Sequence, residues 1–216
     1  AQISGRAVKM IYRRDEDLVA TTKRHPCTTR IRTRVDEDGR LLSFEADLLM
    51  DGGAYNTLTP VVLSRAVLHV CGPYRCDNQR VHGVAVATHT PPNGAFRGFG
   101  APQAQFACER HMDRIARELG IDPIELRRRN LVEEGDTTAT GQPLMQPGAL
   151  TVLEAALTAA QEPGELDGQR PPGAGSGVAR RVAGRGVSLV FHGCGFTGNG
   201  EAKLKGRVGL ELLGRV

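Results

Sequence analysis

The sequence has no tryptophan, and aromatic residues make up only 4% of its 216 residues. No apolar run approaches the roughly 20 residues that a membrane-spanning helix needs, so no membrane attachment is predicted. Glycine (27) and proline (12) are plentiful, but 40% of the residues are hydrophobic, which excludes a wholly disordered chain. We therefore expect a soluble globular protein of one large or two small domains.

The five cysteines show no Cys-x-x-Cys spacing, and their odd number is a poor basis for a disulfide framework. This favours a reducing compartment, and we predict a cytoplasmic protein. The histidines are too widely spaced for a sequence-local zinc site, and no Gly-x-Ser-x-Gly motif indicates a serine hydrolase. The chain begins without Met and in the middle of a pattern, so we expect an internal piece of a longer protein.

The net charge is only +4, which by itself is a weak indication of nucleic-acid binding. Two basic segments are nevertheless present: Arg30, Arg32 and Arg34 alternate along a predicted strand, and Arg127–Arg129 end a predicted helix. Acidic residues on the next strand can neutralise the first segment, and the second complements the helix dipole. A basic binding module without redox activity is the alternative from a different class.

Apolar and polar residues alternate on both sides of Asp38-Gly39, which predicts a β-hairpin over residues 28–50, ended by Asp51–Gly53. Apolar residues recur at helical spacing between Pro102 and Gly120, which predicts a helix over residues 102–119. Glu109 and Asp113 lie on the polar face of this helix. The remaining predictions are helices over 122–130 and 150–161, strands over 81–88 and 187–191, and an apolar segment of undecided type over 61–70. This pattern indicates an α+β fold in which antiparallel strands pack against helices.

The composition changes after residue 161, where proline and glycine dominate and large apolar residues are few. We interpret residues 1–161 as one region, residues 162–183 as a linker, an insert or a frameshifted stretch, and residues 184–216 as the start of a strand-rich segment.

The stretch Asn93–Gln103 is the best candidate site. Glycines on both sides of Phe99 permit unusual backbone angles, and Arg97 supplies a permanent cation beside two aromatic rings. The stretch also leads into a helix N-terminus, where free N–H groups favour anions. A tight turn whose phenylalanines fill the core is the competing interpretation.

Six segments share an order and spacing with a known family: Lys23–Pro26, Asp51–Tyr55, Arg65–His69, Ala95–Gly100 (AFRGFG), Pro102-Gln103 and Leu126–Asn130. Together they resemble the molybdopterin-binding large subunit of the xanthine dehydrogenase and aldehyde oxidase family. The resemblance implies part of the α+β cofactor-binding region of a molybdenum hydroxylase. It also implies molybdenum-molybdopterin, plain or in the cytosine dinucleotide form, with iron–sulfur clusters and FAD in partner subunits or domains.

The resemblance assigns roles position by position. Arg65 matches the arginine that contacts the exocyclic oxygen of a purine, and Phe99 matches the aromatic residue that stacks on the heterocycle. Phe196 and Thr197 resemble a second aromatic residue and its polar neighbour on the substrate side. Phe96, Arg97 and Gly98 match the cofactor-binding loop, in which the Arg97 backbone lies near the molybdenum centre.

The implied reaction is hydroxylation of an electron-poor carbon in a purine such as xanthine or hypoxanthine. An aldehyde or another N-heterocycle is the alternative substrate within the family, where an arginine at position 65 is unusual for aldehydes. The general-base glutamate of the family falls beyond residue 216, so no catalytic residue is assigned and we expect the chain to be inactive alone. Neither nucleic acid nor membrane is an expected partner.

Overall fold

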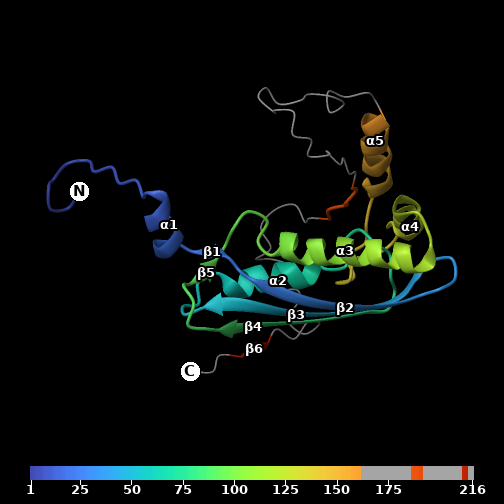
Figure 1. The fold of residues 1–216 in the computed structure, drawn as a ribbon, viewed down its shortest axis with the longest axis horizontal. Helices are drawn as coiled ribbons and strands as arrows, with labels where there is room; N and C mark the ends of the chain where they lie inside the picture. Colours follow the sequence, from blue (N-terminus) through green and yellow to red (C-terminus); the bar gives the residue numbers. More distant parts are fainter. Residues whose placement is uncertain (162–185, 192–210, 214–216) are drawn as a thin grey trace, which may run out of the picture.

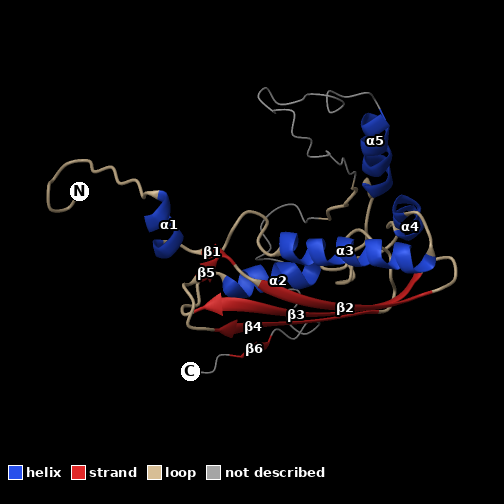
Figure 2. Cartoon of the chain, viewed as in Figure 1, coloured by secondary structure: helices blue, strands red, loops and turns tan. Residues whose placement is uncertain are grey.

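The structure is a computed structural model that describes residues 1–161, 186–191 and 211–213. Its elements in chain order are α1 (Arg14–Ala20), β1 (Lys23–Arg24), β2 (Cys27–Val35), β3 (Leu41–Gly53), α2 (Thr59–His69), β4 (Gln79–Ala87), β5 (Asn93–Gly94), α3 (Ala101–Leu119), α4 (Pro123–Asn130), α5 (Ala149–Gln161) and β6 (Glu211–Leu213). The larger sheet has the order β2-β3-β4-β6, and α2 and α3 lie along one of its faces (Figure 1). The predicted α+β class is confirmed (Figure 2).

The predicted hairpin is present as β2 and β3, and its register explains the arginine row. Arg30 is opposite Asp47, and Arg32 is opposite Glu45, on the exposed side of the sheet. The predicted cross-strand neutralisation therefore has the required geometry. The inward side chains of β3 instead enter the core, where Phe44 is almost fully buried against the helices.

The prediction that Asp51–Gly53 ends the second strand is wrong, because β3 continues through Gly53. The pairing with β4 shifts register between Asp51 and Gly53, so the glycines form an irregularity within the strand. Gly53 has φ +75°, and a Cβ atom there would lie 2.4 Å from the Pro91 carbonyl oxygen. The glycine is needed because another part of the backbone passes directly beside it.

The undecided apolar segment over 61–70 is a helix, α2, which connects β3 to β4 as a crossover. A crossover helix returns the chain to the same end of the sheet, so β3 and β4 pair in parallel. The pairing of β4 with β6 is also parallel. The expectation of antiparallel strands thus holds only for the hairpin, and the sheet as a whole is mixed.

The two helices after the candidate loop begin and end as the sequence predicts. Gly100 and Gly120, both in the left-handed region, flank α3. The Asp122 carboxylate accepts hydrogen bonds from the backbone N–H groups of Ile124 and Glu125, which caps α4. These caps fix the position at which α4 turns back against α3.

The three arginines at the end of α4 do not form a free basic surface. Arg127 is fully buried, Arg128 pairs with Glu154 at 2.6 Å, and Arg129 pairs with Glu125 at 2.9 Å. Arg127 therefore does more than complement the helix dipole, because its charge lies inside the protein. This removes one of the two segments on which the basic binding module depended.

Other parts of the chain lie around this body. Residues 1–13 and α1 project from one end of the sheet, and α5 stands beside α4 (Figure 1). Within the described residues, no helix combines the length and apolar character needed to cross a membrane. Residues 162–183 lie outside the described part of the chain, so the predicted domain boundaries stay predictions.

Candidate functional site

The candidate loop is held between two short strands and a long helix. Lys23-Arg24 in β1 pairs in parallel with Asn93-Gly94 in β5, and α3 begins seven residues later at Ala101. The Asn93 side-chain amide donates to the Asp51 carbonyl at 3.0 Å, and Thr57 donates to the Asn93 carbonyl at 2.6 Å. The start of the loop is thus fixed to the end of β3.

The loop has a backbone conformation that few sequences can adopt. Gly98 and Gly100 both have φ +92°, and Phe99 between them has φ +48°, which is uncommon for a residue with a side chain. A Cβ atom at Gly100 would lie 2.2 Å from the Val62 carbonyl oxygen of α2. The glycines therefore let the loop pack directly on α2 with a Phe99 backbone that costs about 1–3 kcal/mol of strain.

Arg24 ties the middle of the loop to the helix. One of its guanidinium nitrogens donates to the Arg97 carbonyl at 2.8 Å, and another donates to the Gln103 side chain at 3.3 Å. The same guanidinium lies 4.7 Å from the centre of the Phe96 ring, a cation–π contact. Sequence reasoning matched Arg24 to the family but gave it no role, whereas here it fixes the Phe96-Arg97 backbone.

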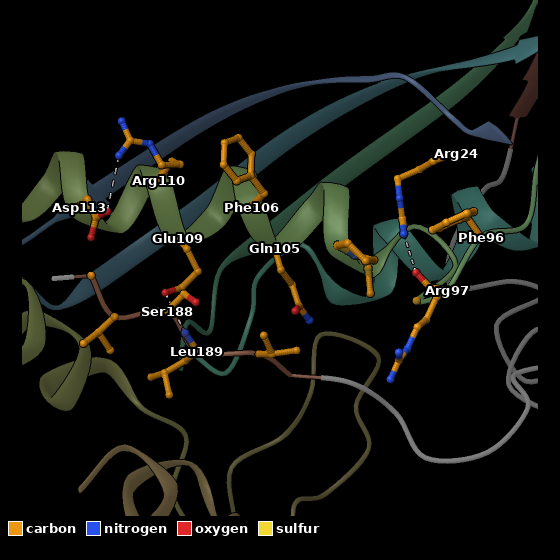
Figure 3. Close-up of a pocket in the computed structure, with 16 residues that line it drawn as sticks. Arg24, Phe96, Arg97, Gln105, Phe106, Glu109, Arg110, Asp113, Ser188 and Leu189 are labelled. Atoms are coloured by element: carbon orange, nitrogen blue, oxygen red, sulfur yellow. Dashed lines mark hydrogen bonds and ion pairs between the residues drawn. The ribbon is translucent and has the colours of Figure 1, made fainter. Parts of the chain in front are cut away.

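A groove with a volume of about 790 Å³ runs between α3 and residues 186–190. Figure 3 shows Arg24, Phe96 and Arg97 at one end of the groove, and Glu109 with Ser188 and Leu189 farther along α3. Phe96, Arg97 and Gly98 all line it. The Arg97 side chain is exposed at this groove.

The substrate-side residues lie elsewhere. Arg65 is a buried residue of α2, at 7% exposure, and the Phe99 ring is half-buried against the same core. The packing of Gly100 on Ala66 brings the candidate loop next to the residue that follows Arg65. Neither Arg65 nor Phe99 lines the groove. Phe196 and Thr197 lie outside the described residues.

Sequence reasoning placed Glu109 on the polar face of α3, but this carboxylate is buried. Its Oε2 accepts from Arg127 Nε at 3.0 Å, and its Oε1 accepts from the Tyr74 hydroxyl at 2.5 Å. Burial, together with the Glu109 charge, raises the pKa of Tyr74 well above its usual value. The spacing in the sequence could have indicated this burial. Glu109 follows Gln105 by four residues and precedes Met112 by three, so all three lie on the buried face of α3.

His25, which lies under the loop, makes the stability of this region depend on pH. It is 1% exposed, its Nε2 lies 2.9 Å from the Thr59 hydroxyl, and burial lowers its pKa although Asp51 opposes this. His25 therefore binds a proton less readily in the folded protein than in the unfolded chain, where it is protonated below about pH 6.5. We expect the free energy of unfolding to fall as the pH is lowered from about 7.5 to about 5.5.

Urea titrations at both pH values measure this effect. The variant His25→Gln should show a weaker pH dependence, and His111, whose pKa burial also lowers, should contribute to what remains. His82, whose side chain is 48% exposed, provides the matched control His82→Gln, which should leave the dependence intact. An unchanged pH dependence in His25→Gln would contradict the assignment.

Comparison with known proteins identifies the family. Residues 1–131 match the molybdopterin cofactor-binding domain, which is more than half of the 216 residues. The chain belongs to this family. It is 46% identical over 133 residues to a probable xanthine dehydrogenase subunit of Bacillus subtilis, covering 62% of this chain and 18% of the relative. It is 42% identical over 156 residues to the nicotinate dehydrogenase large molybdopterin subunit of Eubacterium barkeri, covering 72% and 37%.

A solved structure agrees with this assignment. The aldehyde oxidoreductase from Desulfovibrio gigas superposes with a TM-score of 0.63 at 36% identity, covering 69% of this chain and 17% of that one. The chain therefore corresponds to a minor part of the length of each of these relatives. The resemblance to a molybdenum hydroxylase large subunit is confirmed.

The residues around the loop fit a molybdopterin. A Cβ atom at Gly98 would overlap Pro102 and one at Gly100 would overlap Val62, so the two glycines set the path of the loop past α2 and α3. The exposed Arg97 guanidinium and the N-terminus of α3 both favour an anionic group such as the pterin phosphate. Phe96, Arg97 and Gly98 would hold the cofactor, which when bound supplies the redox chemistry.

Proposed function

We propose that this chain forms part of the large subunit of a molybdenum-dependent oxidoreductase that hydroxylates purines such as xanthine or hypoxanthine. The observation that carries the proposal is a permanent cation, Arg65, in an apolar helix. The guanidinium of an arginine is a permanent cation, and it retains its charge when it is buried. Arg65 is only 7% exposed, and buried apolar residues make up most of its neighbours in α2, so its charge lies in a site of low dielectric.

Arg65 has a clear task if the substrate is a purine. Nucleophilic attack on the ring places negative charge on an exocyclic oxygen, and a positioned guanidinium in a site of low dielectric stabilises that charge. Phe99 offers a ring face for stacking on the heterocycle, and its strained backbone sets the direction of that face. We assign the contacts on the second side of the substrate to Phe196 and Thr197.

The whole enzyme would need further components. Electrons must leave the site after each turnover, and we propose iron–sulfur and FAD subunits or domains as the partners that accept them. The pterin is proposed to be the plain or the cytosine dinucleotide form. A cytoplasmic location is also part of the proposal, supported by the free thiols of the four described cysteines.

The test is the variant Arg65→Met in the complete holoenzyme with its natural partners. We expect kcat/KM for hypoxanthine to fall by about 100-fold, the scale seen when one oxyanion donor is removed. Activity toward an aromatic aldehyde, whose carbonyl does not need this contact, should change by less than about threefold. The matched control Arg114→Met, on a side chain that is 73% exposed, should leave both activities unchanged.

An aldehyde or another N-heterocycle is the second candidate substrate. The observation in its favour is that the similar proteins include an aldehyde oxidoreductase and a nicotinate dehydrogenase. This candidate predicts that Arg65→Met lowers the aldehyde and purine activities equally. A wild-type holoenzyme that oxidises aldehydes or nicotinate but no purine would also decide for it.

A further inference from the structure

Residues 186–191 have the burial pattern of a strand but pair with no strand among the described residues. Val187, Leu189 and Phe191 are buried or half-buried, whereas Ser188 and Val190 are exposed. The strand predicted over 187–191 is therefore not formed among the described residues, although their burial alternates as in a strand. The backbone N–H and C=O groups of such a segment need other partners.

Two side chains of α3 supply those partners. The Leu189 N–H donates to Glu109 Oε2 at 3.0 Å, and the Phe191 carbonyl accepts from the Gln105 side-chain amide. Gln105 and Glu109 are 4% and 7% exposed, so both bonds are shielded from water. We call this pair the α3 clamp.

The spacing of the α3 clamp matches an extended chain. Residues four apart on a helix lie on one face and are separated by about 6 Å along the axis. In an extended segment, the backbone groups of residues two apart point to the same edge, and equivalent groups are separated by about 6.6 Å. The Leu189 N–H and the Phe191 C=O therefore lie on one edge. Gln105 and Glu109 can therefore form hydrogen bonds with the backbone of Leu189 and Phe191, as a neighbouring strand would.

The clamp is rigid on its Glu109 side. Arg127 Nε and the Tyr74 hydroxyl hold the carboxylate, and Arg127 itself donates to Asp113 at 2.9 Å and to the Pro123 carbonyl at 3.0 Å. The carboxylate thus has a fixed position when it receives the Leu189 N–H. The position of residues 189–191 is set by α3 and α4 together.

The clamped segment reaches the helix that carries Arg65. The Phe191 ring lies 6.2 Å from the His69 ring, and His69 Nδ1 lies 2.7 Å from the Arg65 carbonyl oxygen. Residues 187–190 also form one wall of the groove whose end is Phe96, Arg97 and Gly98. A shift of this segment would therefore be transmitted both to α2 and to the groove.

We propose that Gln105 and Glu109 are positioning residues of the substrate site. They hold residues 189–191 in the place of a missing strand, and through Phe191 and His69 they fix the turn of α2 that presents Arg65. The inference rests on the proposed function, because it assigns Arg65 to substrate binding. Neither clamp residue touches the substrate.

The experiment is the variant Gln105→Leu in the complete holoenzyme, with hydrogen exchange measured on peptides covering residues 186–191. Leucine keeps the volume and removes the hydrogen bond to the Phe191 carbonyl. The segment should then separate more often from α3, and exchange of the Leu189 amide, which is bonded to Glu109, should increase at least about tenfold. The KM for hypoxanthine should rise about tenfold, while kcat and the bound molybdenum stay within about twofold. The matched control Glu118→Gln, on an exposed side chain of the same helix, should leave the exchange rate and the KM unchanged.

The outcomes separate the two proposals. Faster exchange with an unchanged KM, unchanged exchange, or a joint loss of kcat and molybdenum would each overturn the positioning role. A wild-type holoenzyme that turns over an aldehyde but no purine would instead overturn the proposed function. In that case, the KM of Gln105→Leu for that aldehyde, compared with the KM of the wild type, would test the positioning role of the α3 clamp.

Discussion

Replacing Arg127 with alanine should lower the free energy of unfolding by about 3–5 kcal/mol, the cost of breaking a buried ion pair from one side. Arg127 is fully buried and pairs with Glu109 and Asp113, each at 2.9 Å. Without it, the Glu109 carboxylate would remain in the interior with no compensating charge. Urea unfolding of the purified protein, followed by circular dichroism, measures the change.

A surface arginine from the neighbouring helix gives the control. Arg114 is 73% exposed and faces Glu118 at 3.8 Å, so Arg114→Ala should cost less than about 0.5 kcal/mol. Asp113→Asn should have an intermediate effect, because its side chain is 34% exposed and water can compensate Arg127 in part. If Arg127→Ala unfolds at the same urea concentration as the wild type, the buried pair contributes nothing to stability.

The variant Gly100→Ala should have a comparable effect, roughly 4 kcal/mol, for a reason of geometry rather than charge. The backbone at Gly100 has φ +92°, which strains any residue with a Cβ atom by about 1–3 kcal/mol. The new methyl group would also lie 2.2 Å from the Val62 carbonyl oxygen and 3.1 Å from Ala66 Cβ. Overpacking of this kind typically costs about 1–3 kcal/mol more.

Gly120→Ala separates the two contributions. Gly120 also has positive φ, at +66°, but a Cβ atom there would meet nothing within 4 Å. We expect it to cost only about 1 kcal/mol, because strain remains and the overlap is absent. Equal urea midpoints for the two variants would show that the contact between the loop and α2 is loose.

Local patterns in the sequence were sufficient where one segment determines its own structure. The hairpin follows from the alternation of apolar and polar residues on both sides of Asp38-Gly39. The start of α4 follows from Asp122 as its cap and Pro123 as its first residue. The type of α2 was not decidable, because seven of the ten residues over 61–70 are apolar and fit a buried helix or a buried strand. Only its packing against β4 and α3 distinguishes these.

The candidate site was predictable in part for the same reason. The glycines and Arg97 of the loop carry a local signal, and three predicted cofactor residues do line one groove. The burial of Glu109 depends on Arg127, 18 residues away, and on Tyr74 before it. A charged residue becomes a core residue only through such a distant partner, which a single sequence does not reveal.

The pairing of β6 with β4 bears on the order in which the chain folds. The hairpin and the α3–α4 pair join segments that are neighbours in sequence, so they can form early and at low entropic cost. The contact of Val84 with Glu211 instead closes a loop that contains more than half of the chain. During synthesis on the ribosome, the β4 edge therefore lacks its β6 partner until residues 211–213 emerge, which leaves this edge open to mispairing.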